Sequence, residues 1–299
     1  MTTTMPAGLA TRPLTTADAA AVTALMADCE RADLGAVFIE EADLVGDWRR
    51  PSFDIGADTI AVLDGDRLVG YAEVYQGRRA EAYVHPDHRG RGIGTALLGW
   101  TRRRAREVGS NLVGQTVPER NRGATDLLRR HGYTPLWTSW VLELPPGAAI
   151  PAAPLPAGYA IRPYRPGEER AVHRIVEDAF AEWPDRAPTR YEDWAAGVLD
   201  RPGFRPEQLL VVVHGDEIVG ACHLLDTDGD AWVNQLAVRV DQRGRGLARG
   251  LLAEAFGAAR SRGARRAQLS TDSRTGALEL YRHVGMHVTT TLTHLAARP

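Results

Sequence analysis

Lysine is absent from this chain of 299 residues, so all 36 of its basic side chains are arginine. A P-loop is therefore excluded, because its grip on phosphate requires the lysine of G-x-x-x-x-G-K-[ST]. Charge of one sign is also lacking, since 38 acidic residues leave a formal net charge of −2. No overall field attracts nucleic acid or an anionic membrane, and we expect neither as a partner.

Cysteine is scarce as well. Cys29 and Cys222 have no neighbouring histidine or cysteine at ligand spacing, and we expect both to be small buried side chains in a reducing compartment. No apolar run approaches the roughly 18 residues of a membrane span. The first ten residues lack an apolar segment behind a positive start, which argues against a signal peptide. Together these absences predict a cytoplasmic protein.

The nine histidines do not form a recognisable metal-binding motif. His85 and His88 are close in sequence, as are His283 and His287, but Gly285 interrupts the second pair. No cysteine or carboxylate completes a tetrahedral ligand set at either place. We therefore expect structural roles for these side chains and no metal.

The chain does contain an internal repeat with a period near 150 residues. Four segments recur in the same order. Residues 11–14, 60–75, 80–98 and 121–133 match residues 161–164, 210–225, 234–252 and 273–286. Four matches in one order indicate one structural module present twice.

A proline-rich stretch separates the two copies. Residues 143–160 contain five prolines, which remove backbone donors and fix φ, so helix and central strand are disfavoured there. The sequence predicts a first domain over 1–144, a semi-rigid linker over 145–157, and a second domain over 158–299.

Each copy has the same pattern of expected elements. A first strand and an amphipathic helix precede a variable segment, after which two strands are joined by tight turns at Gly65 and Gly215. A third strand (82–84 or 236–238) leads through a glycine-rich loop into a long helix. A strand (111–116 or 266–271), a shorter helix and a final strand follow. This order predicts an α/β domain with a mixed sheet.

The glycine-rich loop is the strongest chemical signal. It reads Arg-Gly-Arg-Gly-Ile-Gly over 89–94 and Arg-Gly-Arg-Gly-Leu-Ala over 243–248. N–H groups at a helix N-terminus favour an anion, and small residues let the backbone approach a diphosphate. Flanking arginines can add charge-assisted hydrogen bonds. Neither copy matches the dinucleotide pattern G-x-G-x-x-G.

The pattern [Q/R]-x-x-G-x-[G/A] after a short apolar strand resembles the acetyl-CoA loop of the GCN5-related N-acetyltransferase (GNAT) superfamily. Each copy of the repeat shows this resemblance, and the two copies together account for nearly the whole chain. It implies two acyl-CoA N-acyltransferase domains, each a mixed, splayed β-sheet flanked by helices. It also implies acetyl-CoA as cofactor and a small-molecule primary amine as acceptor, which attacks the thioester directly.

The resemblance implies which residues contact coenzyme A. The strand would pair with the pantetheine arm, and the loop amides would hold the pyrophosphate. In the first copy these residues are Ala82, Val84, Arg89, Gly90, Arg91, Gly92, Ile93, Gly94 and Asn121. In the second they are Leu236, Ala237, Val238, Arg243, Gly244, Arg245, Gly246, Leu247 and Ala248.

The two copies differ in their candidate catalytic residues. Tyr281 stands where the family often has the proton donor for the leaving thiolate, whereas the first copy has Leu128. The candidate general base, Glu81, belongs to the first copy, and the aligned residue of the second is Gln235. Possible substitutes in the second copy are Asp178, Glu182 and His223. We predict that the second copy is catalytic and that the first is either a degenerate cofactor site or a scaffold, although its intact loop favours cofactor binding.

The acceptor amine stays open. The variable segments, 30–54 and 178–198, mix carboxylates with aromatic residues, which suits a cationic amine but is also common on charged helix faces. The tandem layout is similar to that of mycothiol synthases, which acetylate a cysteinyl amine. A non-catalytic acyl-CoA-binding module and a protein acetyltransferase are further alternatives. Acyl chain length, the number of bound cofactors and oligomeric state also stay open.

Overall fold

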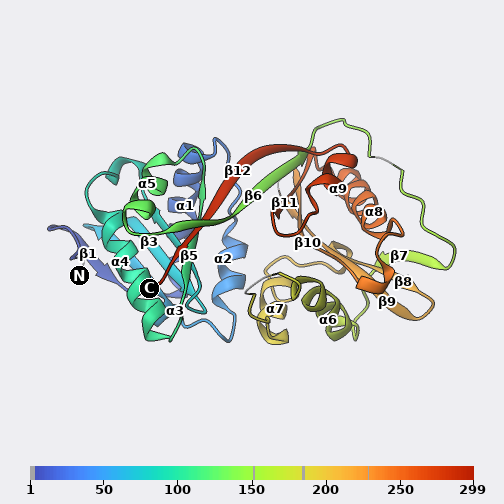
Figure 1. Cartoon of the computed structure of the whole chain (residues 1–299), viewed down its shortest axis with the longest axis horizontal. Coiled ribbons are helices and arrows are strands. Elements are labelled where there is room, and N and C mark those ends of the chain that lie inside the picture. Colours follow the sequence, from blue (N-terminus) through green and yellow to red (C-terminus); the bar gives the residue numbers. More distant parts are fainter. Residues whose placement is uncertain (1–3, 151, 184–185, 228) are drawn as a thin grey trace. The chain divides into compact units, whose positions relative to one another are not determined.

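The computed structural model describes residues 4–150, 152–183, 186–227 and 229–299. The chain divides into two compact units (Figure 1). Unit 1 contains Met1–Thr138, Ala195–Pro202 and Leu292–Pro299, and unit 2 contains Ser139–Trp194 and Gly203–Thr291. Pro151 of the expected linker, and Pro184 and Asp185 of the second variable segment, lie outside the described residues. The described part of 145–157 contains no helix or strand.

Unit 1 is built on a mixed sheet in the order β1-β2-β3-β4-β5-β12. Neighbouring strands are antiparallel except for the parallel pair β4–β5. The strands are β1 (Ala10–Arg12), β2 (Thr59–Asp64), β3 (Arg67–Tyr75), β4 (Arg79–Val84), β5 (Val113–Pro118) and the end of β12 (His287–Ala297).

Unit 2 repeats this sheet in the order β7-β8-β9-β10-β11-β6. Its parallel pair is β10–β11. The strands are β7 (Tyr159–Pro163), β8 (Leu209–His214), β9 (Glu217–Thr227), β10 (Asp230–Val238), β11 (Arg266–Asp272) and the end of β6 (Thr134–Leu144). The predicted mixed α/β architecture is confirmed in both copies.

The last strand of each unit comes from the other copy of the repeat. Leu295 of β12 pairs with Gln115 of β5 in unit 1, and Leu142 of β6 pairs with Leu269 of β11 in unit 2. Leu295 and Leu142 are both fully buried in the core of the unit that they enter. Each core is therefore completed by a strand from outside its own repeat.

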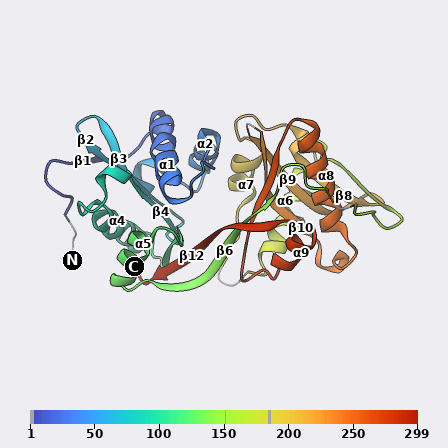
Figure 2. The ribbon, with the colours of Figure 1, turned by 90° about the horizontal axis from the view of Figure 1, so that it is seen from above.

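Helices cover both faces of each sheet. In unit 1, α1 and α2 pack on one face, and α4 and α5 on the other (Figure 2). In unit 2, α6 packs against Ala237 of β10, whereas α8 and α9 share a core with Leu224 and Val233. The helices are α1 (Ala19–Asp33), α2 (Glu41–Trp48), α3 (Ile55–Asp58), α4 (Ile93–Glu107), α5 (Arg122–Arg130), α6 (Glu169–Phe180), α7 (Tyr191–Val198), α8 (Leu247–Ser261) and α9 (Leu278–His283).

The two thiols are buried, as expected. Burial raises the pKa of Cys29 to about 11 and that of Cys222 to about 12, so both are held as thiols near neutral pH. Among the described residues, no cluster of three or more His, Cys, Asp or Glu side chains could hold a metal ion. Within that same part of the chain, no helix has the length and apolar character needed to cross a membrane.

Candidate functional site

Each glycine-rich loop ends at the first turn of a long helix. Gly92 caps α4 with φ +88°, and Gly246 caps α8 with φ +80°. Gly90 and Gly244 also have positive φ, at +77° and +74°. A side chain would be strained in this left-handed backbone, which explains the glycines. The first N–H groups of both helices have no partner four residues earlier and so form an anion-binding terminus.

The first arginine of each loop is bound to its own strand. In unit 1, Nε of Arg89 donates to the carbonyl of Val84, and its guanidinium forms two bonds to Asp33 at 2.7 and 3.0 Å. Asn121 caps α5 through Ala124 N–H and also donates to Asp33 at 2.8 Å. Arg89 and Asn121 thus tie the loop, α1 and α5 together.

Unit 2 repeats the arginine anchor with a different acid. Arg243 donates through Nε to the carbonyl of Val238 and through its guanidinium to Glu182, at 3.1 and 2.8 Å. Arg274, which stands where unit 1 has Asn121, is bound to Asp272 and lies over the Trp183 ring. Arg91 and Arg245, the second arginines of the two loops, are exposed, as are Arg89 and Arg243.

The parallel strands before each loop separate. In the described structure, β4 pairs with β5 through a single register pair, Arg79 with Gly114. In unit 2 the β10–β11 pairing runs from Asp230 to Val233 and stops there. The segments predicted to bind the pantetheine arm, 82–84 and 236–238, lie beyond these points. Their edges keep backbone groups that an extended ligand can pair with.

The separation in unit 2 coincides with a β-bulge. The β9–β10 register shifts between Val233 and Gln235, which leaves Asn234 as the extra residue. Its side-chain nitrogen lies 3.2 Å from Nδ1 of His223 on β9. A bulge interrupts the ladder and bends its strand, and such bulges are common beside active sites. The β3–β4 register of unit 1 runs from Tyr75 to Gly70 with no shift.

Tyr281 and Leu128 occupy equivalent positions. The N–H of Met286 donates to the carbonyl of Tyr281, and that of Tyr133 donates to the carbonyl of Leu128, both at 3.1 Å. Tyr281 is 8% exposed and shares a core with Leu236 of β10, on the segment predicted to bind the pantetheine arm. Burial, and to a smaller extent the nearby Cys222, raises the pKa of Tyr281 to about 12. The phenol is therefore protonated throughout the neutral range.

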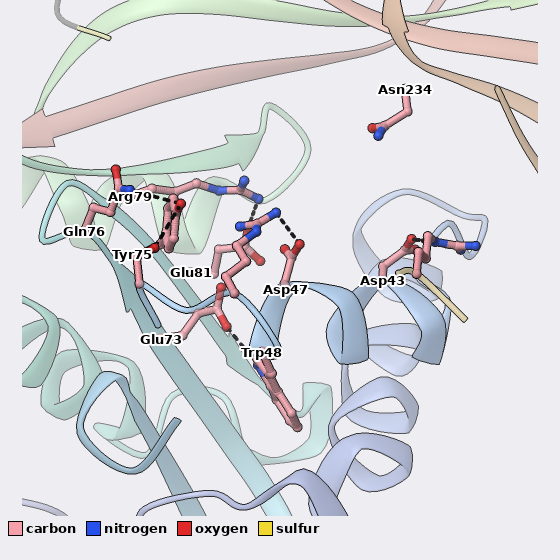
Figure 3. Close-up of polar contacts among 12 residues, drawn as sticks. Asp43, Asp47, Trp48, Glu73, Tyr75, Gln76, Arg79, Glu81 and Asn234 are labelled. Atoms are coloured by element: carbon pink, nitrogen blue, oxygen red, sulfur yellow. Dashed lines mark hydrogen bonds and ion pairs between the residues drawn. The ribbon is translucent and has the colours of Figure 1, made fainter. Parts of the chain in front are cut away.

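Glu81 does not stand alone in unit 1. It pairs across the strands with Glu73 of β3, so the two carboxyl groups share one face of the sheet. Glu81 forms an ion pair with Arg79, while Glu73 accepts a bond from Nε1 of Trp48 at 3.3 Å (Figure 3). Glu73 also accepts a short hydrogen bond from the Tyr71 hydroxyl.

Unit 2 has no carboxyl groups at these two places. His223 pairs with Gln235 as Glu73 pairs with Glu81. Gln235 accepts a bond from Nε1 of Trp194 at 3.0 Å. Of the proposed substitutes for a base, only His223 faces this position, because Glu182 is bound to Arg243 and Asp178 is exposed on α6.

Sequence reasoning missed Glu73, Trp48 and the bulge at Asn234. Glu73 lies at the centre of the stretch Tyr-Ala-Glu-Val-Tyr over 71–75. A charged residue within an otherwise apolar strand was the signal that could have identified it. The burial of Glu73 depends on Trp48 of α2, which the local sequence around Glu73 does not reveal.

Comparison with known proteins agrees with the repeat. A family model described as "Acetyltransferase (GNAT) family" matches residues 21–133 and 169–286. A mycothiol acetyltransferase of Sanguibacter keddieii is 33% identical over 273 residues, which cover 84% of this chain and 83% of that protein. One from Thermobispora bispora is 29% identical over 241 residues, covering 77% and 80%.

Solved structures share the fold over nearly the full chain. A GCN5-related N-acetyltransferase from Sphaerobacter thermophilus is 32% identical with a TM-score of 0.77, and the match covers 99% of this chain and 98% of that one. A tandem GNAT protein from the clavulanic acid biosynthesis pathway has a TM-score of 0.74 at 20% identity, covering 97% and 98%. At that identity the second likeness bears on the fold alone.

Proposed function

The chain belongs to the GNAT family of acetyltransferases, and we propose that its second unit transfers an acetyl group from acetyl-CoA to the primary amine of a small molecule. As a tandem member of this family, the protein is an acetyl-CoA-dependent acetyltransferase. The observation that carries the assignment to unit 2 is the buried phenol of Tyr281 beside the splayed cofactor strand. Unit 1 has the equally buried hydrocarbon Leu128 there.

The donor set at each loop fits coenzyme A. We assign the pyrophosphate to the first-turn N–H groups of α8, reached past Gly244 and Gly246, and the pantetheine arm to the free edge at 236–238. Arg243 acts here by fixing the loop to the end of β10, since its guanidinium is already bound to Glu182. The corresponding residues of unit 1 form a second candidate cofactor site.

Acetyl-CoA supplies a thioester carbonyl, and the chain must orient the amine and protonate the departing sulfur. We assign the proton donor role to Tyr281, whose phenol is protonated throughout the neutral range. The interrupted ladder around Asn234 leaves backbone polar groups beside the gap, where a donor can stabilise an oxyanion.

A second candidate acceptor is a cysteinyl amine. It is favoured by the relatives named mycothiol acetyltransferase, one of which is 33% identical over most of both chains. The alternative of a non-catalytic acyl-CoA-binding module is disfavoured, because binding alone does not require the proton donor that Tyr281 provides. A cytoplasmic location is part of the same proposal.

Replacing Tyr281 by phenylalanine tests the assignment. The variant is made in a Gly92→Asp background, whose added carboxylate repels pyrophosphate from the first loop, so that unit 2 alone is measured. We expect kcat to fall about 100-fold with the KM for acetyl-CoA unchanged, because the donor acts only on the departing thiolate. Released thiol is followed with S-methylcysteinamide, glucosamine and a panel of simple primary amines.

Tyr133→Phe in the same background is the matched control. It removes the hydroxyl of another buried tyrosine, which is 2% exposed and lies in unit 1. Its kcat should match that of the parent. Equal kcat in the Tyr281→Phe protein and its parent would remove Tyr281 from the mechanism, and wild type that acetylates no amine would count against the proposed reaction itself.

A further inference from the structure

Glu73 and Glu81 form a carboxyl pair in unit 1 that has no counterpart in unit 2. They lie directly opposite each other on antiparallel strands, where side chains on one face are neighbours. Like charges on neighbouring carboxyl groups disfavour each other, which favours a proton on one of the two. We therefore expect one carboxyl group of the pair to hold a proton that is lost as the pH rises.

The surroundings decide which carboxyl group holds the proton. The Glu81 side chain is 23% exposed and forms an ion pair with Arg79. Glu73 is 8% exposed and packed beneath α2. Burial, and then the charge of Glu81, raises the pKa of Glu73 to about 7, against the hydrogen bond from Tyr71.

The other charged groups around the pair come from the elements packed on this face. Asp47 of α2 adds negative charge near Glu73, and Arg79 of β4 opposes it. Glu30 of α1 lies within electrostatic reach of Glu81, but its carboxylate is bound to the N–H groups of Phe38 and Ile39. Glu73 is thus the member of this group whose pKa is raised to near neutrality.

The pair lies beside an intact cofactor framework. Glu81 stands on β4 just beyond the last pairing with β5, and the strand ends at the loop that opens α4. Gly90 and Gly92 of that loop have positive φ, as Gly244 and Gly246 have in unit 2. Unit 1 therefore combines a splayed strand, an anion-binding helix terminus and a titrating carboxyl pair.

On the basis of the proposed acetyl-transfer reaction, we propose that unit 1 is a second acetyl-transfer centre, in which Glu81 accepts the proton of the incoming amine and Glu73 is a positioning residue whose charge controls Glu81. When Glu73 is ionised, its negative charge makes Glu81 a better proton acceptor. When Glu73 is protonated, that assistance is lost and transfer slows.

The step balances as follows. The acceptor enters as an ammonium ion and gives one proton to Glu81. The amine nitrogen forms a bond to the acetyl carbon, the carbon–sulfur bond breaks, and a second proton moves from nitrogen to sulfur. The products are an amide and the free thiol, and Glu81 returns its proton to solvent. This route needs no proton donor at Leu128, since the second proton comes from the nucleophile.

The carboxyl pair can be tested in the full chain with no acceptor present. In an infrared pH titration, the carbonyl band of a protonated carboxyl group should disappear with a midpoint near 7 and should be missing in Glu73→Gln. Glu81→Gln removes the like charge and should move the midpoint to lower pH. Tyr71→Phe removes a donor to the carboxylate and should move it to higher pH. A titration unchanged in all three variants overturns the coupling.

The second centre is tested in a Gly246→Asp background, with each amine that wild type acetylates. We compare kcat/KM of the parent with kcat/KM of its Glu73→Gln variant at each pH. Because the amine ionises in the same way in both assays, its own pH dependence drops out of this ratio. That ratio should rise to about tenfold as the pH passes 7. Glu73→Asp should retain the pH-dependent rise, which a merely structural role for Glu73 would not require.

The two proposals fail separately. If wild type acetylates amines but the Gly246→Asp protein acetylates none, unit 1 is not a second centre and the proposed function of unit 2 stands. A ratio that stays flat across pH 7 removes Glu73 from control of the reaction. If wild type acetylates no amine, the proposed function fails, while the infrared titration still decides the carboxyl pair.

Discussion

Glu73 and His223 occupy the same register position in the two strand pairs but bring different chemistry to it. The repeat allowed Glu81 to be aligned with Gln235 and Tyr281 with Leu128, because each lies in a recognisable block. Glu73 was not singled out, since its meaning depends on Trp48, which lies 25 positions away in the sequence. Burial by a distant partner is information that a local pattern does not hold.

Glu73 should leave a signature in the pH dependence of stability. Its pKa is raised from 4.5 to about 7 in the folded chain, so the folded state binds more protons than the unfolded state between these values. The stabilising contribution is fully present below about pH 4.5 and is lost as the pH rises through 7, at up to roughly 1.4 kcal/mol per pH unit. Urea unfolding of wild type and Glu73→Gln from pH 5 to 8 measures it.

We expect the unfolding free energy of wild type to fall relative to that of Glu73→Gln as the pH rises. Glu279→Gln, a change at an exposed ion pair of α9, is the control and should track wild type. A constant difference across this range would mean that Glu73 does not hold a proton in the folded chain.

At the scale of elements, local patterns predicted the order of strands and helices well. The amphipathic helix expected after the first strand of the second copy is α6, and the strands expected over 82–84 and 236–238 are the ends of β4 and β10. The bulge at Asn234 and the exchange of the last strands were not predicted. Both depend on which strand pairs with which, and hydrophobic alternation fixes the faces of a strand but not its partner.

The exchange predicts that core mutations act on the opposite unit. Leu295→Ala on β12 should destabilise unit 1, and Leu142→Ala on β6 should destabilise unit 2, each by about 2–5 kcal/mol, because each leaves a cavity in a filled core. Hydrogen exchange with peptide resolution measures this. Each variant is the other's control, matched in residue type and burial.

We expect faster hydrogen exchange in β2–β5 of the Leu295→Ala protein. In the Leu142→Ala protein we expect it in β8–β11. The opposite distribution would place each final strand in its own repeat.

At the scale of the whole molecule, the repeat preserves the geometry of the glycine-rich loop twice, whereas the proposed acid–base residues differ between the two units. Both loops keep their positive-φ glycines, and Arg89 and Arg243 each donate to a carbonyl at the end of the strand that precedes the loop. Tyr281 remains in unit 2 and the carboxyl pair in unit 1. This division is consistent with the two proposed centres, in which different residues move the protons.

The central claim is that each unit holds its own acetyl-CoA, and calorimetric titration of acetyl-CoA tests it most directly. Wild type should bind two equivalents, and Gly92→Asp and Gly246→Asp should each bind one, because a carboxylate at either helix terminus repels the pyrophosphate. The double variant should bind none. One equivalent in wild type, abolished by one of the substitutions and unaffected by the other, would contradict the account by showing that a single unit holds the cofactor.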